Sequence, residues 1–209
     1  MPDSIAAFIA DLAATRIGAT VNPYSAYEPS IERSGGAAIR VRNLADYLAA
    51  RPHPRLMLVG EAPGYQGCRF SGIAFTSERS LPPERRTSLR PEGWSEPSAT
   101  IIGRALRAAG IEDDTLMWNA CPTHPAGPTP LSNRTPTAAE VDAGEVFLRR
   151  LIDLLEPDLI CAVGKTAARR LGGAPAIRHP ANGGATECAT GIATIAVRLG
   201  LDPRVKESL

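Results

Sequence analysis

Several features that would place this chain in a special class of protein are missing from its sequence. None of the four cysteines stands in a C-x-x-C pair, and the three histidines are equally scattered, so neither a zinc ribbon nor a compact iron–sulphur motif is indicated. No apolar run reaches the ~18–20 residues that span a bilayer. Basic and acidic residues number 23 and 22. Net charge therefore points to neither nucleic acid nor membrane, and a nucleic-acid surface would have to come from local clustering.

What remains is the composition of an ordinary globular protein. Apolar residues make up 44% and charged residues 22% of the 209 positions, which excludes disordered, collagen-like and coiled-coil chains. A chain of this length is expected to form a single domain over residues 1–209. The first 14 residues carry Asp3 and Asp11 but no Lys or Arg, so we expect no signal peptide. Scattered unpaired cysteines are typical of reduced thiols, so we expect a cytoplasmic protein.

Apolar periodicity predicts an alternation of helices and strands. The expected helices are Ser4–Thr15, Ile39–Ala50, Ala99–Ala109, a long helix capped by Thr137, and one that starts near Lys165. The expected strands are Arg55–Gly60, Thr115–Asn119, Leu159–Val163 and Gly191–Val197. This order predicts an α/β fold, a three-layer αβα arrangement around a central four-stranded parallel sheet. Ligands bind beyond the carboxyl ends of such strands, so the loops that begin there are the candidate site.

Four side chains near those loops carry chemistry that a binding site needs. Glu61, in the turn Gly60–Gly64, is either a base or water-holding group or an exposed turn acid. Phe75 is either a stacking platform or part of the core, and Asn119 is either a ligand contact or a turn former. His179 lies in a Gly-rich turn just before the expected last strand, and that place distinguishes it from the other two His-Pro dipeptides.

The chain resembles the uracil-DNA glycosylase superfamily, and most closely its iron–sulphur class (family four). The resemblance rests on an ordered set of motifs: the G-E-A-P-G turn Gly60–Gly64, Gly72-x-x-Phe75, the strand ending in Asn119, Asn133–Thr137, the run Glu156–Leu171, and His179-Pro-Ala181. It covers about Leu56–Val197, whereas residues 1–38, expected to form a helix and a loop, carry none of it. It implies a uracil-DNA glycosylase-like fold.

The resemblance also implies roles for individual residues. Glu61 matches the acid that positions the attacking water, and His179 matches the histidine that stabilises charge on the departing base. Phe75 matches the aromatic ring that stacks on the flipped base, and Asn119 matches the amide that reads the pyrimidine edge. The remaining residues implied to line the base pocket are Gly60, Ala62, Gly64, Tyr65 and Gln66. Gly64 stands where the most uracil-selective class has a tyrosine that blocks the thymine methyl, so Tyr65 or Gln66 would have to fill that space.

Departures from the iron–sulphur class predict that this chain needs no metal and no cofactor. The chain has no cysteine before Cys68. Two family cysteine positions are occupied by Thr123 and Gly144, and Cys121 falls two positions early. A [4Fe–4S] cluster takes four thiolates, so we expect no cluster.

DNA contacts are expected from basic residues in the long loop Glu61–Pro97 and in the late helix. These residues are Arg69, Arg79, Arg85 and Arg86 in the loop, with Lys165 and Arg169 in the helix. The loop reads either as a lid that grips DNA or as a solvated charged segment.

The predicted activity is that of a monofunctional uracil-DNA glycosylase in base-excision repair. The enzyme would hydrolyse the N-glycosidic bond of flipped deoxyuridine in single- or double-stranded DNA, releasing free uracil and leaving an abasic site. We expect a nucleoid-associated monomer with no membrane partner. Two alternatives stay open: excision of other deaminated or damaged bases, and binding of DNA or uracil without turnover.

Overall fold

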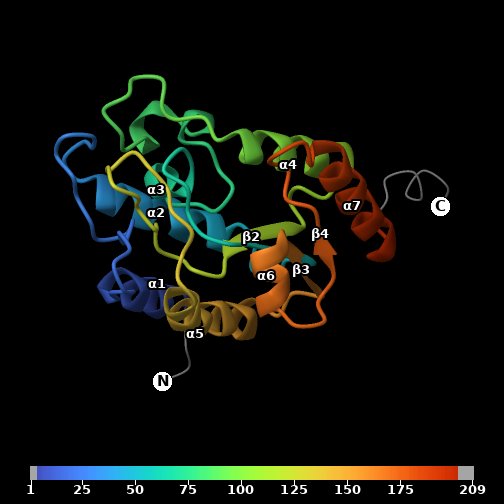
Figure 1. Ribbon diagram of the computed structural model, residues 1–209. Helices are drawn as coiled ribbons and strands as arrows, with labels where there is room; N and C mark the ends of the chain where they lie inside the picture. The colour runs from blue at the N-terminus through green and yellow to red at the C-terminus, as the bar shows by residue number, and fades with distance from the viewer. Residues whose placement is uncertain (1–3, 202–209) are drawn as a thin grey trace.

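The computed structural model describes residues 4–201 as a parallel sheet between two layers of helices (Figure 1). The strands are β1 (Leu56–Gly60), β2 (Thr115–Asn119), β3 (Leu159–Val163) and β4 (Ala176–Ile177), all parallel and in the spatial order β2-β1-β3-β4. The α-helices are α1 (Ile5–Ala14), α2 (Gly36–Ala49), α3 (Cys68–Ser71), α4 (Pro97–Ala108), α5 (Ala138–Leu155), α6 (Lys165–Arg170) and α7 (Ala185–Arg198). The predicted three-layer α/β architecture is confirmed. None of the helices within residues 4–201 has the length and apolar character needed to traverse a bilayer.

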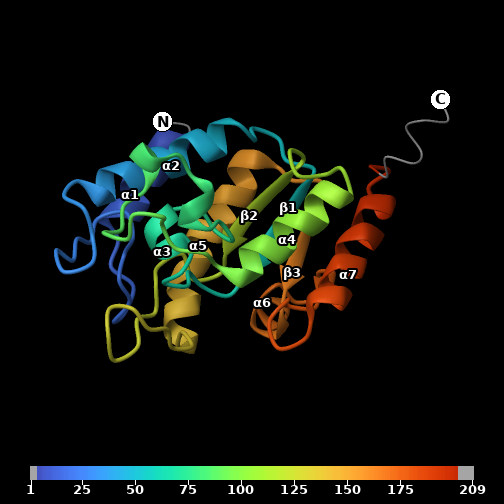
Figure 2. The ribbon, with the colours of Figure 1, turned by 90° about the horizontal axis from the view of Figure 1, so that it is seen from above.

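The two faces of the sheet support two apolar cores. Every residue of β1 is buried, as expected for a central parallel strand. Met57 and Val59 point into a core shared with α1, α2 and α5, whereas Leu56 and Leu58 point into a core shared with α4 and α7. Figure 2 shows α4 and α7 side by side over one face, and Figure 1 shows α1 and α5 on the other. The alternation follows from the two-residue period of a strand.

The prediction of a fourth strand at Gly191–Val197 is wrong, because these residues form half of the helix α7. Its β-branched composition favours a strand, but Cys188, Ile192 and Ile195 recur at helical spacing and are buried against the sheet. The true fourth strand, β4, is only two residues long. A Cβ atom at Gly191 would lie 2.7 Å from Cγ2 of Ile177, so the glycine allows α7 to pack closely on β4.

The N-terminal segment that the resemblance does not cover packs into the core that also contains Met57 and Val59 of β1. Phe8 of α1 packs against Trp118 of β2 and Phe147 of α5, with ring centroids 5.7 and 6.0 Å away. Farther along, the Tyr24 hydroxyl donates a hydrogen bond to the Gly72 carbonyl at 3.0 Å. This segment therefore braces the backbone three residues before Phe75.

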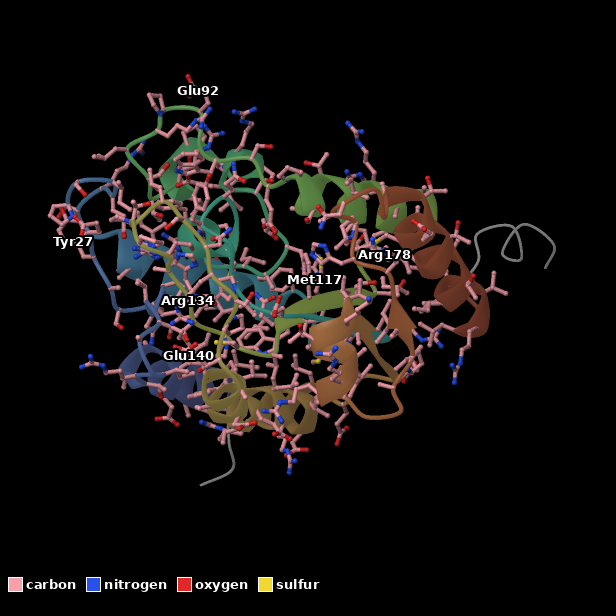
Figure 3. All side chains as sticks on the ribbon, viewed as in Figure 1. Tyr27, Glu92, Met117, Arg134, Glu140 and Arg178 are labelled. Carbon is pink, nitrogen blue, oxygen red and sulfur yellow. The ribbon has the colours of Figure 1, made fainter. Side chains whose placement is uncertain are left out.

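Thr137 begins α5 as predicted, in a capping box with Glu140. The Thr137 hydroxyl accepts from the Glu140 amide at 3.2 Å, and the Glu140 carboxylate accepts from the Thr137 amide at 2.8 Å. Both carboxylate oxygens also accept from Arg134 at 2.7 Å, and Figure 3 shows the two side chains together above α5. Hydrogen bonding from Arg134 is the main reason that the pKa of Glu140 falls to about 2.

Candidate active site

A cavity of about 170 Å³ lies at the carboxyl ends of the strands, and we call it the strand-end cavity. All four strand ends contribute to it: Glu61 follows β1, Asn119 ends β2, Lys165 follows β3, and His179 follows β4. The chain order of the strands reverses between β1 and β3, which is where ligand sites form in open α/β sheets. Seven predicted residues line this one cavity: Glu61, Ala62, Gly64, Phe75, Asn119, Lys165 and His179.

Phe75 is held against the end of β1 in an uncommon backbone conformation. Its φ angle is 48°, in the left-handed region that residues with a side chain adopt only when their surroundings impose it. The ring lies against the backbone of Gly60, where a Cβ atom would overlap it. The predicted role of Gly60 is therefore refined, because it does not line the cavity but makes room for the ring that does.

Asn119 and Glu61 present polar groups that nothing within residues 4–201 satisfies. Asn119 is 5% exposed, and no hydrogen bond of the described residues involves its side-chain amide. The Oε1 atom of Glu61 is likewise buried without a partner. Leaving a buried polar atom such as Oε1 of Glu61 unpaired costs about 1–3 kcal/mol, so this arrangement is typical of a site that a ligand completes.

The geometry of His179 favours a neutral ring with its proton on Nε2. The Ala181 amide donates to Nδ1 at 3.1 Å, so Nδ1 acts as an acceptor and Nε2 carries the hydrogen. Burial lowers the pKa of this histidine from 6.5, and the nearby Glu61 carboxylate opposes that shift. Arg178, labelled in Figure 3 beside the start of α7, lowers the pKa further. His179 can therefore donate one hydrogen bond into the cavity near neutral pH.

The residues that follow Gly64 do not fill the space above it. Tyr65 and Gln66 are absent from the lining of the strand-end cavity, and the Tyr65 ring packs edge-on against Trp94 with centroids 5.3 Å apart. The Tyr65 amide donates to Oδ1 of Asn133 at 2.9 Å. The nearest atom to a Cβ at Gly64 would be Nδ2 of Asn133, at 3.8 Å, an ordinary van der Waals contact, so a small side chain would fit at this position. Neither Tyr65 nor Gln66 therefore meets the condition under which larger bases would be excluded.

The arginines of the long loop are placed differently from one another. Arg69 is 3% exposed and forms an ion pair with the buried Glu32, so the prediction that it contacts DNA is wrong. Arg85 binds Asn43 and Asp46, and Arg86 donates to three backbone carbonyls of its own loop. Arg79, by contrast, is exposed and lines a second hollow of about 350 Å³ that also reaches Phe75.

This loop is a packed block organised around one buried carboxylate. Glu78, fully buried, accepts hydrogen bonds from Thr87, Ser88 and Trp94, at distances from 2.5 to 3.1 Å. The sequence indicated only a segment without periodicity, because these hydrogen bonds join residues 9 to 16 positions apart and follow no helix or strand repeat. Lys165 and Arg169 are both exposed at α6, and only Lys165 reaches the cavity.

Two residues that sequence reasoning missed shape the site. His124 is fully buried, and its Nδ1 lies 2.8 Å from the carbonyl of Pro63, in the middle of the Gly60–Gly64 turn. Burial lowers the pKa of His124 to about 4, so the ring is neutral and donates to this carbonyl. The second residue is Glu96, which lines the cavity from the start of α4. No local signal in the sequence distinguishes either one from its neighbours.

The cysteines do not provide an iron–sulphur site. All four are free and buried, and residues 4–201 contain no group of three or more His, Cys, Asp or Glu that could hold a metal ion. Burial raises the pKa of every one of these thiols, to about 12 for Cys68 and about 11 for Cys161. A [4Fe–4S] cluster takes four thiolates gathered at one place, so the described residues do not fit such a cluster.

The fold matches that of a structure already solved. It is similar to the crystal structure of wild-type SMUG2 from Pedobacter heparinus, with a TM-score of 0.62 and 16% sequence identity, over 92% of this chain and 97% of that one. A search of the curated proteins found no match.

The sequence identifies the family. Residues 48–196 match the family model of the Uracil DNA glycosylase superfamily, so the chain belongs to this superfamily. Membership, together with the fold, supports a DNA glycosylase that removes a base from DNA in base-excision repair.

Proposed function

We propose that this protein is a monofunctional uracil-DNA glycosylase. The observation that carries the proposal is the convergence of Glu61, Phe75, Asn119 and His179 on one cavity at the strand ends. Such a pocket cannot reach a base within a duplex, so the nucleotide must be extruded first. Extrusion costs a few kcal/mol and costs least for a weakly paired base, such as uracil opposite guanine.

Recognition of the extruded base falls to Phe75 and Asn119. Stacking on an aromatic ring is worth about 1–3 kcal/mol per base, and Phe75 is held in place for it by the backbone around Gly60. The Asn119 amide can donate to O4 of uracil and accept from N3–H. Cytosine reverses both groups, so an amide in one orientation would be left mispaired with it.

Cleavage leaves an oxocarbenium-like sugar and an anionic uracil. The Nε2–H group of His179 and the backbone N–H groups of the Gly60–Gly64 turn are the donors for negative charge at O2 of uracil. The Glu61 carboxylate would orient the attacking water and stabilise the positive sugar. Each of these steps uses groups of this chain.

Uracil release from a defined oligonucleotide tests this proposal. We expect the folded protein to release free uracil from single- or double-stranded DNA and to leave an alkali-labile abasic site. Glu61→Gln should lower turnover more than DNA binding, whereas Glu84→Gln, at an exposed glutamate of the long loop, should change neither. Absence of uracil release from both substrates would refute the proposal, and uracil binding without release would support a non-catalytic relative.

The absence of a side chain at Gly64 favours a second candidate activity. Because Gly64 has no side chain and neither Tyr65 nor Gln66 lines the cavity, no bulky residue of this turn excludes bases larger than uracil. The two candidate activities can be separated by a substrate panel. It contains oligonucleotides with hypoxanthine, xanthine or a thymine mismatch, assayed beside the uracil substrate. Faster release of one of these bases than of uracil would favour the second activity.

A further inference from the structure

Glu96 is a second carboxylic acid at the strand-end cavity, with no counterpart among the predicted site residues. Its backbone is fixed at the start of α4: its amide donates to the Ser77 hydroxyl at 2.9 Å, and its carbonyl accepts from the Thr100 amide at 3.2 Å. The side chain lines the same cavity as Glu61, Asn119 and His179. The fold thus fixes its backbone position, and the residue borders the cavity in which the proposed substrate would bind.

One carboxyl oxygen of Glu96, Oε2, is buried without a partner. No hydrogen bond or ion pair of the described residues reaches the carboxyl group. A Cβ atom on Gly67 would overlap the carboxyl, so the chain has a glycine where this group must fit. The fully buried glutamates Glu32 and Glu78 differ: Glu32 pairs with Arg40 and Arg69, and Glu78 accepts four hydrogen bonds.

Burial makes Glu96 an acid that holds its proton near neutrality. Its pKa is raised to about 7 by desolvation. The other ionisable side chains that line the cavity are Glu61, Cys68, Lys165 and His179. The thiol of Cys68, with its pKa raised to about 12, stays neutral over the range in which Glu96 titrates. A protonated carboxyl is a hydroxyl donor, whereas the ionised form only accepts.

We propose that protonated Glu96 contacts the flipped base directly and donates a hydrogen bond to one of its carbonyl oxygens. Deamination of a base replaces an amino donor with a carbonyl acceptor, so a hydroxyl donor in the cavity favours the deaminated form. Glu96 is then a specificity-determining residue that complements Asn119. This role rests on the proposed glycosylase function, and it adds a dependence on pH that Asn119 cannot provide.

The test measures binding of free uracil by calorimetry at pH 6 and pH 8. A group with a pKa of about 7 is ~90% protonated at the lower pH and ~10% at the higher, so we expect wild-type affinity to fall about tenfold. Glu96→Gln keeps a donor that does not titrate, so its affinity should change less than ~2-fold between the two values. Glu96→Ala should bind weakly at both. Glu92→Gln, at an exposed glutamate of the same loop, should behave as wild type.

A second measurement distinguishes two outcomes: that Glu96 does not have the proposed role, and that the protein is not a uracil-DNA glycosylase. The pH profile of kcat/KM for uracil excision should lose its alkaline limb in Glu96→Gln, with folding of each variant checked by circular dichroism. Equal pH dependence in wild type and Glu96→Gln, or wild-type uracil affinity and excision in Glu96→Ala at pH 6, would overturn the role of Glu96 alone. If wild-type protein neither binds uracil nor excises it, the proposed function itself fails.

Discussion

The ring of Phe75 occupies the space that a side chain on Gly60 would need. A Cβ atom there would overlap the ring and would lie 2.9 Å from Oδ1 of Asn119. Gly60→Ala should therefore displace both base-contacting groups and lower uracil excision about 10²-fold, since a shift near 1 Å can have that effect.

The matched control for this change is Gly64→Ala, in the same turn. Its Cβ atom would meet its nearest neighbour at an ordinary 3.8 Å, so excision should stay within ~3-fold of wild type. Single-turnover kinetics with a uracil oligonucleotide measures both variants. If the two lose activity equally, the turn as a whole, and not the packing of Phe75 on Gly60, controls the rate.

His179→Ala should lower excision about 10²–10³-fold, the usual effect of removing one donor to a developing anion. The loss should appear in kcat and leave DNA affinity nearly unchanged. His53→Ala is the control, because His53 also precedes a proline but is exposed and leads into β1 at the opposite end of the sheet. Equal rates for wild type and His179→Ala would remove this histidine from the mechanism.

Asn119→Asp should weaken recognition of uracil, because an ionised carboxylate cannot donate to O4. A buried group left unpaired costs about 1–3 kcal/mol, so we expect roughly a 5- to 150-fold drop in kcat/KM for uracil at pH 7.5. Competition between uracil- and cytosine-containing oligonucleotides measures the accompanying loss of selectivity. Full activity and selectivity in this variant would show that Asn119 does not read the base.

His124 should make the protein sensitive to mild acid. Its pKa is about 4 in the folded chain against 6.5 when exposed, so below pH 6.5 the unfolded state binds the proton first. The resulting loss of stability grows as pH falls from 6.5 to 4 and reaches roughly 3 kcal/mol. His124→Asn keeps an N–H donor for the Pro63 carbonyl but does not titrate. Urea unfolding at pH 7 and pH 4.5 should show a smaller decrease for this variant than for wild type.

Arg79 is the loop arginine best placed to bind a phosphate, because it is exposed beside the hollow that reaches Phe75. Arg79→Gln should weaken DNA binding and lower the slope of log affinity against log salt by about 1. Arg85→Gln should leave that slope unchanged, since Asn43 and Asp46 already hold its guanidinium group. Fluorescence anisotropy with labelled DNA at several salt concentrations measures the affinity of both variants and so gives their slopes.

The local sequence pattern predicted secondary structure correctly where burial in the fold and interactions between chain neighbours favour the same element. β1, β2 and β3 lie at or within one residue of the predicted ranges, and Thr137 caps α5 as its sequence indicates. The pattern failed at Gly191–Val197, because a β-branched run is compatible with a strand as well as a buried helix. It also failed for Arg69, because its burial depends on Glu32, which lies 37 residues away in the chain.

The sequence by itself determined the α/β class, the family and the side chains that could read and release a base, because these depend on periodicity and on motifs of a few neighbouring residues. Only the tertiary structure decided which of these residues share a cavity, which arginines remain exposed, and that Glu96 joins the site. Those properties depend on which residues are buried and on which residues distant in the chain come into contact. Burial sets the pKa of a carboxyl group, and contacts between distant residues set the space beside a glycine.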